Sequence, residues 1–190
     1  MFTKKMVTWA VIGFCVIFTS VCFWGCNVVN KNKVDVGKFE PLVRAASKVK
    51  ASANVGMDFR QFGQYIQEYA TEVEIIKNKV SSDKEKEILN YFSNALEIYN
   101  DSKIIWNCKN NDPVRASLEQ YGAAATGGKI WLAPGGVVID ELNAIVQKYK
   151  LEVHEHGGDK TISENSIPQL WSEASKLIDA ANASLQQSAK

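Results

Sequence analysis

A run without charged residues, from Met6 to Asn30, is the feature that most constrains this chain. It holds no Asp, Glu, Lys or Arg over about 25 residues, and Lys4 and Lys5 precede it. A helix needs about 20 predominantly apolar residues to cross the hydrocarbon core of a bilayer. We therefore expect the run to enter a membrane or the secretion machinery.

The run is compatible with three fates. An uncleaved transmembrane anchor fits its length, and Trp9 and Trp24 lie near its two ends, where indole rings favour membrane interfaces. A cleaved signal peptide fits the two preceding lysines, although its apolar part usually spans roughly 7–15 residues. A lipoprotein signal would be lipidated on Cys26, which follows the small residue Gly25. All three fates place residues from about 31 onward outside the cytoplasmic membrane. We expect a location at the cell membrane, with residues 31–190 on the exported side.

The exported part is long enough for one domain with its own core. The whole chain has a formal net charge of +1, and no basic stripe stands out, so we expect no nucleic-acid partner. Of the four cysteines only Cys108 follows the apolar run, which leaves no pair for an intradomain disulfide. We therefore divide the chain into a signal or anchor segment, residues 1–30, and an exported helical domain, residues 31–190.

Helical periodicity dominates the exported part. Apolar residues recur at spacings of three and four from Met57 to Val80, which predicts one long amphipathic helix. The order Ser82-Asp83-Lys84-Glu85 is that of a capping box, in which Ser82 and Glu85 each bond a free amide at a helix start. Asp112-Pro113 predicts the start of a further short helix. Similar apolar spacing predicts helices over residues 35–53, from the capping box to about residue 107, over 137–150 and over 167–185.

Two short segments, residues 129–133 and 151–156, have the composition or alternation of strands. The predicted fold is therefore mainly α. It has an N-terminal membrane helix or signal segment, then a four- to five-helix bundle that includes a small two-stranded β element.

The candidate chemical sites are few. His154 and His156 are the only histidines, and on a strand they would face the same side, near Asp159. A structural zinc needs four ligands, commonly Cys and His, and no further histidine is available to complete a set. Neither a correctly spaced phosphate-binding loop nor a Gly-x-Ser-x-Gly turn is present. We expect no metal, no cofactor and no catalysis.

Three aromatic residues, Tyr65, Trp106 and Trp131, fall outside the clear apolar stripes. Together they would line an exposed aromatic groove for a partner or a small apolar ligand. The sequence favours a membrane-tethered exported module with a structural or protein-interaction role in the cell envelope. Its expected partners are membrane lipid, through residues 6–30, and another envelope protein or a second copy. The alternative is a ligand-binding or sensory helical domain with a pocket between helices.

Overall fold

The computed structural model describes residues 33–56, 58–110, 129–131, 140–156 and 159–189. The chain divides into two compact units, Met1–Lys31 and Asn32–Lys190, and all described residues belong to the second. The expectations for the charge-free run, for Cys26 and for the short helix at Asp112 lie outside these ranges. Among the helices that the structure describes, none combines the length and the apolar character that a membrane crossing requires.

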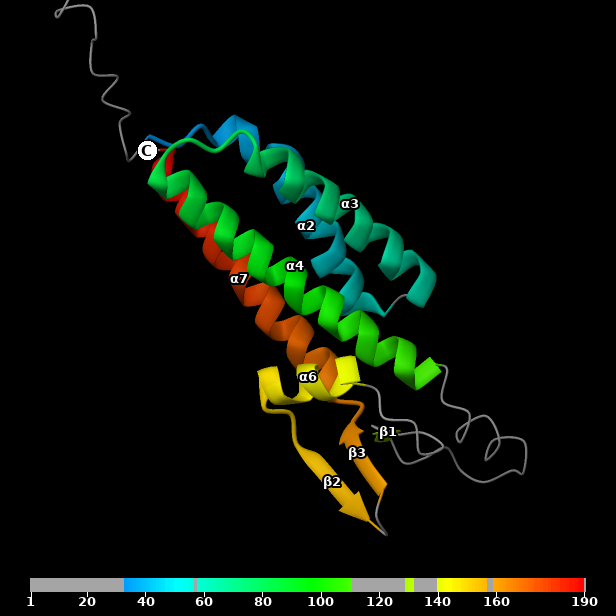
Figure 1. Ribbon diagram of the computed structural model, residues 1–190. Coiled ribbons are helices and arrows are strands. Elements are labelled where there is room, and N and C mark those ends of the chain that lie inside the picture. The colour runs from blue at the N-terminus through cyan, green and yellow to red at the C-terminus, as the bar shows by residue number, and fades with distance from the viewer. Residues whose placement is uncertain (1–32, 57, 111–128, 132–139, 157–158, 190) are drawn as a thin grey trace, which may run out of the picture. The chain divides into compact units, whose positions relative to one another are not determined.

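Four long helices pack side by side, and each contacts two neighbours (Figure 1). Short connections join the first three, so consecutive helices run antiparallel. The last helix returns along both its neighbours and ends beside the start of the first (Figure 1). The four helices are α2 (Val36–Val55), α3 (Phe59–Lys77), α4 (Asp83–Asn110) and α7 (Ser166–Ser188).

The main core lies between these helices and is filled by large side chains. The central part of the stripe predicted between residues 57 and 80 is confirmed, because its members are buried along the inner face of α3, which ends at Lys77. Phe59 and Val80, at the two ends of the stripe, are half-buried. Tyr69 is fully buried, and its hydroxyl donates a hydrogen bond to the carbonyl of Phe92 at 2.7 Å. Burial raises the pKa of Tyr69, so the hydroxyl stays a donor. Other fully buried core residues are Phe39, Leu42, Phe62, Ile76, Ile88 and Tyr99.

A second, smaller core joins the far ends of α4 and α7 to a fifth helix and a sheet. The fifth helix is α6 (Asp140–Tyr149), which begins within the predicted range 137–150. The sheet has the order β1-β3-β2 with antiparallel neighbours, from β1 (Lys129–Trp131), β2 (Val153–His156) and β3 (Asp159–Ser163). This core is formed by Ile105, Leu142, Ile145, Val146, Ile162, Ile167 and Leu170.

The mainly helical fold with a small antiparallel β element is confirmed. The predicted strand segments 129–133 and 151–156 contain β1 and β2, but these strands do not pair with each other. Both pair with β3, which the sequence pattern does not predict. The reason is its composition, since Ile162 is the only large apolar residue in Asp159–Ser163. Thr161 and Ile162 are adjacent and point to opposite faces of the sheet, and both are buried. The strand β3 is therefore covered on both faces, and its sequence lacks the alternation of apolar and polar residues that is typical of a half-exposed strand.

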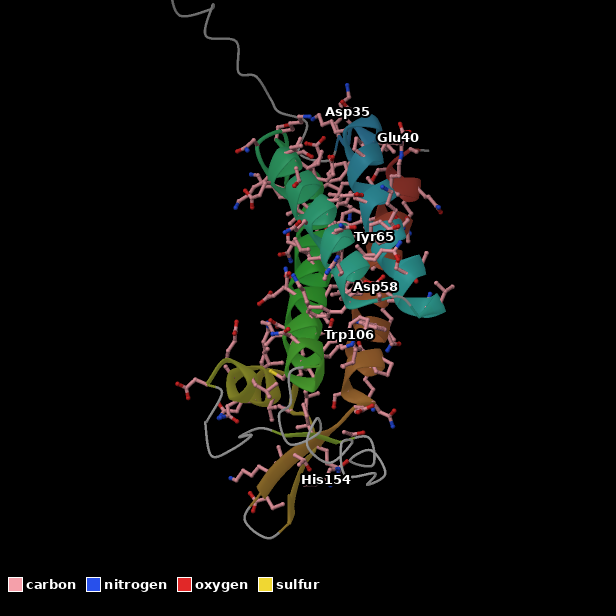
Figure 2. The ribbon with its side chains drawn as sticks, turned by 90° about the vertical axis from the view of Figure 1, so that its right-hand side faces the viewer. Asp35, Glu40, Asp58, Tyr65, Trp106 and His154 are labelled. Carbon is pink, nitrogen blue, oxygen red and sulfur yellow. The ribbon has the colours of Figure 1, made fainter. Side chains whose placement is uncertain are left out.

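Two helix starts follow predictable chemistry. The capping box at α4 is confirmed, because the Glu85 amide donates to Ser82 Oγ at 3.1 Å and the Ser82 amide donates to Glu85 Oε2 at 3.4 Å. Asp58 precedes α3, and its carboxylate accepts hydrogen bonds from the amides of Arg60 and Gln61 (Figure 2). These contacts satisfy amides that a helix itself leaves free.

Candidate functional site

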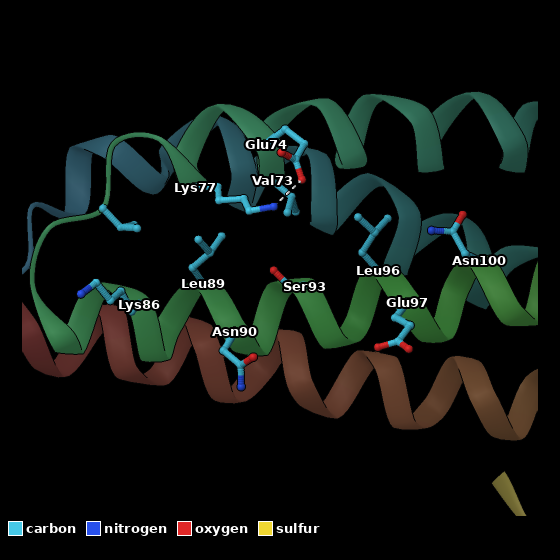
Figure 3. A pocket seen from close by; sticks show the side chains of 11 residues that line it. Val73, Glu74, Lys77, Lys86, Leu89, Asn90, Ser93, Leu96, Glu97 and Asn100 are labelled. Carbon is cyan, nitrogen blue, oxygen red and sulfur yellow. Dashed lines mark hydrogen bonds and ion pairs between the residues drawn. The ribbon is translucent and has the colours of Figure 1, made fainter. Parts of the chain in front are cut away.

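An open groove with a volume of about 630 Å³ lies between α3 and α4. We call it the α3–α4 groove (Figure 3). Val73 and Leu89 form its floor and are only 6% and 8% exposed, while Val80 and Leu96 are half-buried. The groove is lined by Val73, Glu74, Lys77, Val80, Lys86, Leu89, Asn90, Ser93, Leu96, Glu97 and Asn100.

The groove exists because of the residues that α4 turns toward it. Lys86, Asn90, Ser93, Glu97 and Asn100 succeed one another at spacings of three and four, so they share one helical face. At Asn90 and Ser93 that face has short polar side chains, which do not fill the space beside α3 as the core residues do. The face spans about 21 Å at 1.5 Å per residue, which is the length of about four helical turns.

The charges of the groove are unevenly placed. Lys77 and Lys86 lie toward the α3–α4 turn, whereas Glu97 lies further along α4 (Figure 3). Lys77 pairs with Glu74 at 3.3 Å, and Lys86 pairs with Asp83 at 3.6 Å. All four of these side chains are more than half exposed, and such pairs contribute about 0–1 kcal/mol. Either lysine can therefore exchange its partner at little cost.

Glu97, at the other end of the groove, belongs to a network of charged and polar side chains. Lys148 Nζ on α6 donates to Glu97 Oε1 and to Asp101 Oδ2, both at 2.6 Å. The hydroxyl of Tyr149 donates to the same Asp101 oxygen at 2.7 Å. Burial and the Asp101 carboxylate raise the pKa of Tyr149 to about 12. This cluster joins α6 to α4. The side chains that can change their ion-pair partners most easily are therefore Lys77 and Lys86, at the opposite end of the groove.

A buried carboxylate joins the start of α4 to the start of α2. Glu85 is 1% exposed, and its Oε2 atom accepts from the amides of Ser81 and Ser82. Its Oε1 atom accepts from the Asp35 amide and from Lys38 Nζ, both at 3.0 Å. Burial alone would raise the pKa of Glu85, but these hydrogen bonds outweigh it and lower the pKa to about 2.

A second hollow, of about 460 Å³, lies between the start of α2 and the end of α7. We call it the α2–α7 hollow. Val36 and Gly37 from the first turn of α2 form part of its wall, and Leu185 faces them from α7. Its remaining lining residues are Glu40, Val43, Asn182, Gln186 and Ala189.

The three aromatic residues predicted to share a groove have different surroundings. Tyr65 lies in the first half of α3, and its hydroxyl accepts a hydrogen bond from Gln61 Nε2 at 3.2 Å (Figure 2). Trp106 lies near the end of α4 and packs against other rings (Figure 2). The side chain of Trp131 lies outside the part of the chain that the structure describes. The shared aromatic groove therefore stays a prediction.

Trp106 belongs to an aromatic cluster where α3, α4 and α7 meet. Its ring lies 5.6 Å from those of Phe59 and Phe62 and 5.5 Å from that of Trp171, measured between centroids. Trp171 Nε1 donates to the fully buried Ser102 hydroxyl at 2.8 Å. These contacts indicate a packing role for Trp106, although its side chain is only half-buried.

The predicted histidine pair lies on β2, and only one of its side chains is described. His154 is exposed and opposite Thr161, while His156 is opposite Asp159 in the register of β2 and β3. Within the described residues, no three His, Cys, Asp or Glu side chains are placed to hold a metal ion. The side chains of His156 and Asp159 lie outside that set, so the absence of a metal stays a prediction.

Comparisons with protein-family models, with curated proteins and with solved structures find no match to this chain. Its function is therefore argued from its own residues. The apolar stripes of the sequence include Val73 and Val80 but did not single out the polar residues that line the α3–α4 groove. The spacing of Asn90, Ser93 and Glu97 beside the apolar stripe of α4 is the signal that could have found them.

Proposed function

We propose that this protein is a membrane-tethered, exported helical module of the cell envelope that binds another envelope protein and performs no catalysis. The charge-free run at residues 6–30 supports the tether, because its length and composition suit a bilayer. The observation that carries the binding role is the open α3–α4 groove, which combines an apolar floor with a lysine-bearing end.

The occupant proposed for the groove is an amphipathic helix of the partner protein. The groove runs for about four helical turns, and helices bind such grooves through apolar residues at spacings of three, four and seven. The partner's apolar stripe would cover Val80, Leu89 and Leu96. An acidic residue of the partner would lie toward Lys77 and Lys86, whose present ion pairs are weak.

The sensory alternative has less support from the described residues. A ligand pocket inside a bundle needs space between the helices, and here Phe62, Tyr69 and Tyr99 occupy that space as fully buried side chains. The α3–α4 groove and the α2–α7 hollow are both open to solvent. An open groove suits a large partner better than a small ligand, which usually has most of its surface buried.

Photo-cross-linking in intact cells tests the proposal. A photoreactive residue replaces Ser93, which lines the groove, or the adjacent Asn94, which is exposed and does not line it. We expect an adduct from position 93 whose cross-linked peptide comes from an amphipathic helix with an acidic residue. Lys86→Glu should reduce the yield of that adduct.

Three results would contradict the proposed occupant. One is the absence of an adduct from position 93, and another is the same adduct from positions 93 and 94. The third is an adduct between two copies of this chain, which would assign the groove to self-association.

A further inference from the structure

The first turn of α2, Val36–Glu40, is poorly supported by its own helix. Gly37 has a low helix propensity, and Pro41 has no amide hydrogen to donate to the Gly37 carbonyl. A residue before proline also disfavours the helical region, which applies to Glu40. Asp35 stands at the N-cap position without a side-chain capping hydrogen bond. Hydrogen bonding within α2 is therefore interrupted at Pro41, and the turn before it depends on contacts with other parts of the fold.

Contacts with the α3–α4 turn and the start of α4 hold this first turn of α2 in place. One oxygen of Glu85 suffices for the capping box, and the other accepts from the Asp35 amide and from Lys38 Nζ. Lys38 Nζ also reaches the carbonyl of Lys79 at 3.5 Å. Phe39 anchors the same turn, since its side chain is fully buried in the main core.

We propose that residues 35–40 form a latch that closes on Glu85 and opens as a unit about Pro41. Asp35 and Glu40 mark its two ends (Figure 2). The latch supplies Val36, Gly37 and Glu40 to the wall of the α2–α7 hollow. Opening withdraws Phe39 from the core and extends that hollow into the space between α2 and α7.

The position of the latch in the chain gives it a regulatory use. The segment that precedes it in sequence joins α2 at Asp35, so a load on that segment acts first on the Glu85 contacts. A tether or a partner that holds the preceding residues would then control whether the latch is open. This use rests on the tethering proposed for residues 6–30, whereas the local opening does not.

Hydrogen exchange of the full chain in detergent micelles tests the latch. The informative amides are those of Asp35, which donates to Glu85, and Lys38, which donates to the Asp35 carbonyl, because the other first-turn amides of a helix are free in any case. We expect these two amides to exchange together and faster than those of residues 42–49 of the same helix. Lys38→Met removes the ammonium but leaves the capping box intact, and should accelerate exchange of residues 35–40 about fivefold to tenfold. Gly37→Ala should slow it about fivefold, because alanine favours the helix and its Cβ meets only Asp35 Oδ1 at 3.4 Å.

Lys48→Met provides the matched control, since Lys48 lies on α2 and pairs with Glu68 on α3 through an exposed contact at 2.7 Å. It should leave exchange of residues 35–40 unchanged. Uniform exchange along α2, or equal effects of Lys38→Met on residues 35–40 and 42–49, would overturn the latch. Membrane fractionation of the same proteins reports the tether separately, so a failed tether is distinguished from a failed latch.

Discussion

Replacing Glu85 by glutamine tests how much one buried carboxylate contributes to this fold. Glutamine keeps the shape of the side chain but loses the charge and one acceptor. Its NH₂ group would face either the Ser81 and Ser82 amides or the Asp35 amide with Lys38. At one of these two places an N–H group would then face another N–H group, at a side chain that is only 2% exposed. We therefore expect Glu85→Gln to destabilise the domain clearly.

The pKa of Glu85 gives the magnitude. Its fall from the ordinary 4.5 to about 2 corresponds to about 3 kcal/mol of stability at neutral pH, since each unit of pKa is worth about 1.4 kcal/mol. Because the folded state has the lower pKa, this contribution is fully present above pH 4.5 and is lost as the pH falls toward 2. The difference between the parent and Glu85→Gln should therefore shrink by about 2–3 kcal/mol between pH 7 and pH 2.5.

Urea unfolding of residues 32–190, followed by far-ultraviolet circular dichroism, measures both quantities. Glu87→Gln is the matched control, because Glu87 is half exposed and pairs with Lys84 on the same helix. Its effect should stay within about 0.5 kcal/mol at either pH. A Glu85→Gln effect that equals the control, or that does not change with pH, would refute the reasoning.

Three further predictions concern the cores and the histidines. Ile66→Ala should lower the free energy of unfolding in urea by about 2–4 kcal/mol, because Ile66 is 3% exposed. The control Lys77→Ala removes an exposed side chain and should change it by no more than about 0.5 kcal/mol. Equal effects would show that the apolar face of α3 is wrongly assigned. Tyr149→Phe should cost about 1 kcal/mol and remove the tyrosine that titrates near pH 12 in an ultraviolet titration; no change in either measurement would contradict the Asp101 contact. A chelator, and the double change His154→Ala with His156→Ala, should leave the melting temperature unchanged; a drop on chelation that stoichiometric zinc reverses would establish a metal site.

The helices could be predicted because their signal is local. In α3 the burial of Phe62, Ile66 and Val73 follows from their spacing alone, since a helix with one apolar face has one way to bury it. The capping box was predictable for the same reason, because its two partners are three residues apart. Such short-range patterns were enough to predict the long helices.

The features that could not be predicted depend on residues far apart in sequence. Glu85 reads as a capping residue, yet its second oxygen binds the Asp35 amide 50 residues away. The strand β3 carries one large apolar residue and owes its place to pairing with β1 and β2. The α3–α4 groove exists because the short side chain of Ser93 leaves space between α3 and α4 where the two helices lie side by side. The first two features do not follow from spacing along the chain. Spacing places Ser93 on the polar face of α4, but it does not show that α3 lies beside that face.

The intact mass of the protein recovered from membranes after an alkaline wash tests the tether most directly. We expect the chain to stay in the membrane fraction, either with residues 1–30 retained or with a lipid on Cys26 after cleavage before it. In the lipidated case Cys26→Ala should abolish retention. Recovery from the soluble fraction, with no lipid and with residues 1–25 missing, would contradict a membrane-tethered module.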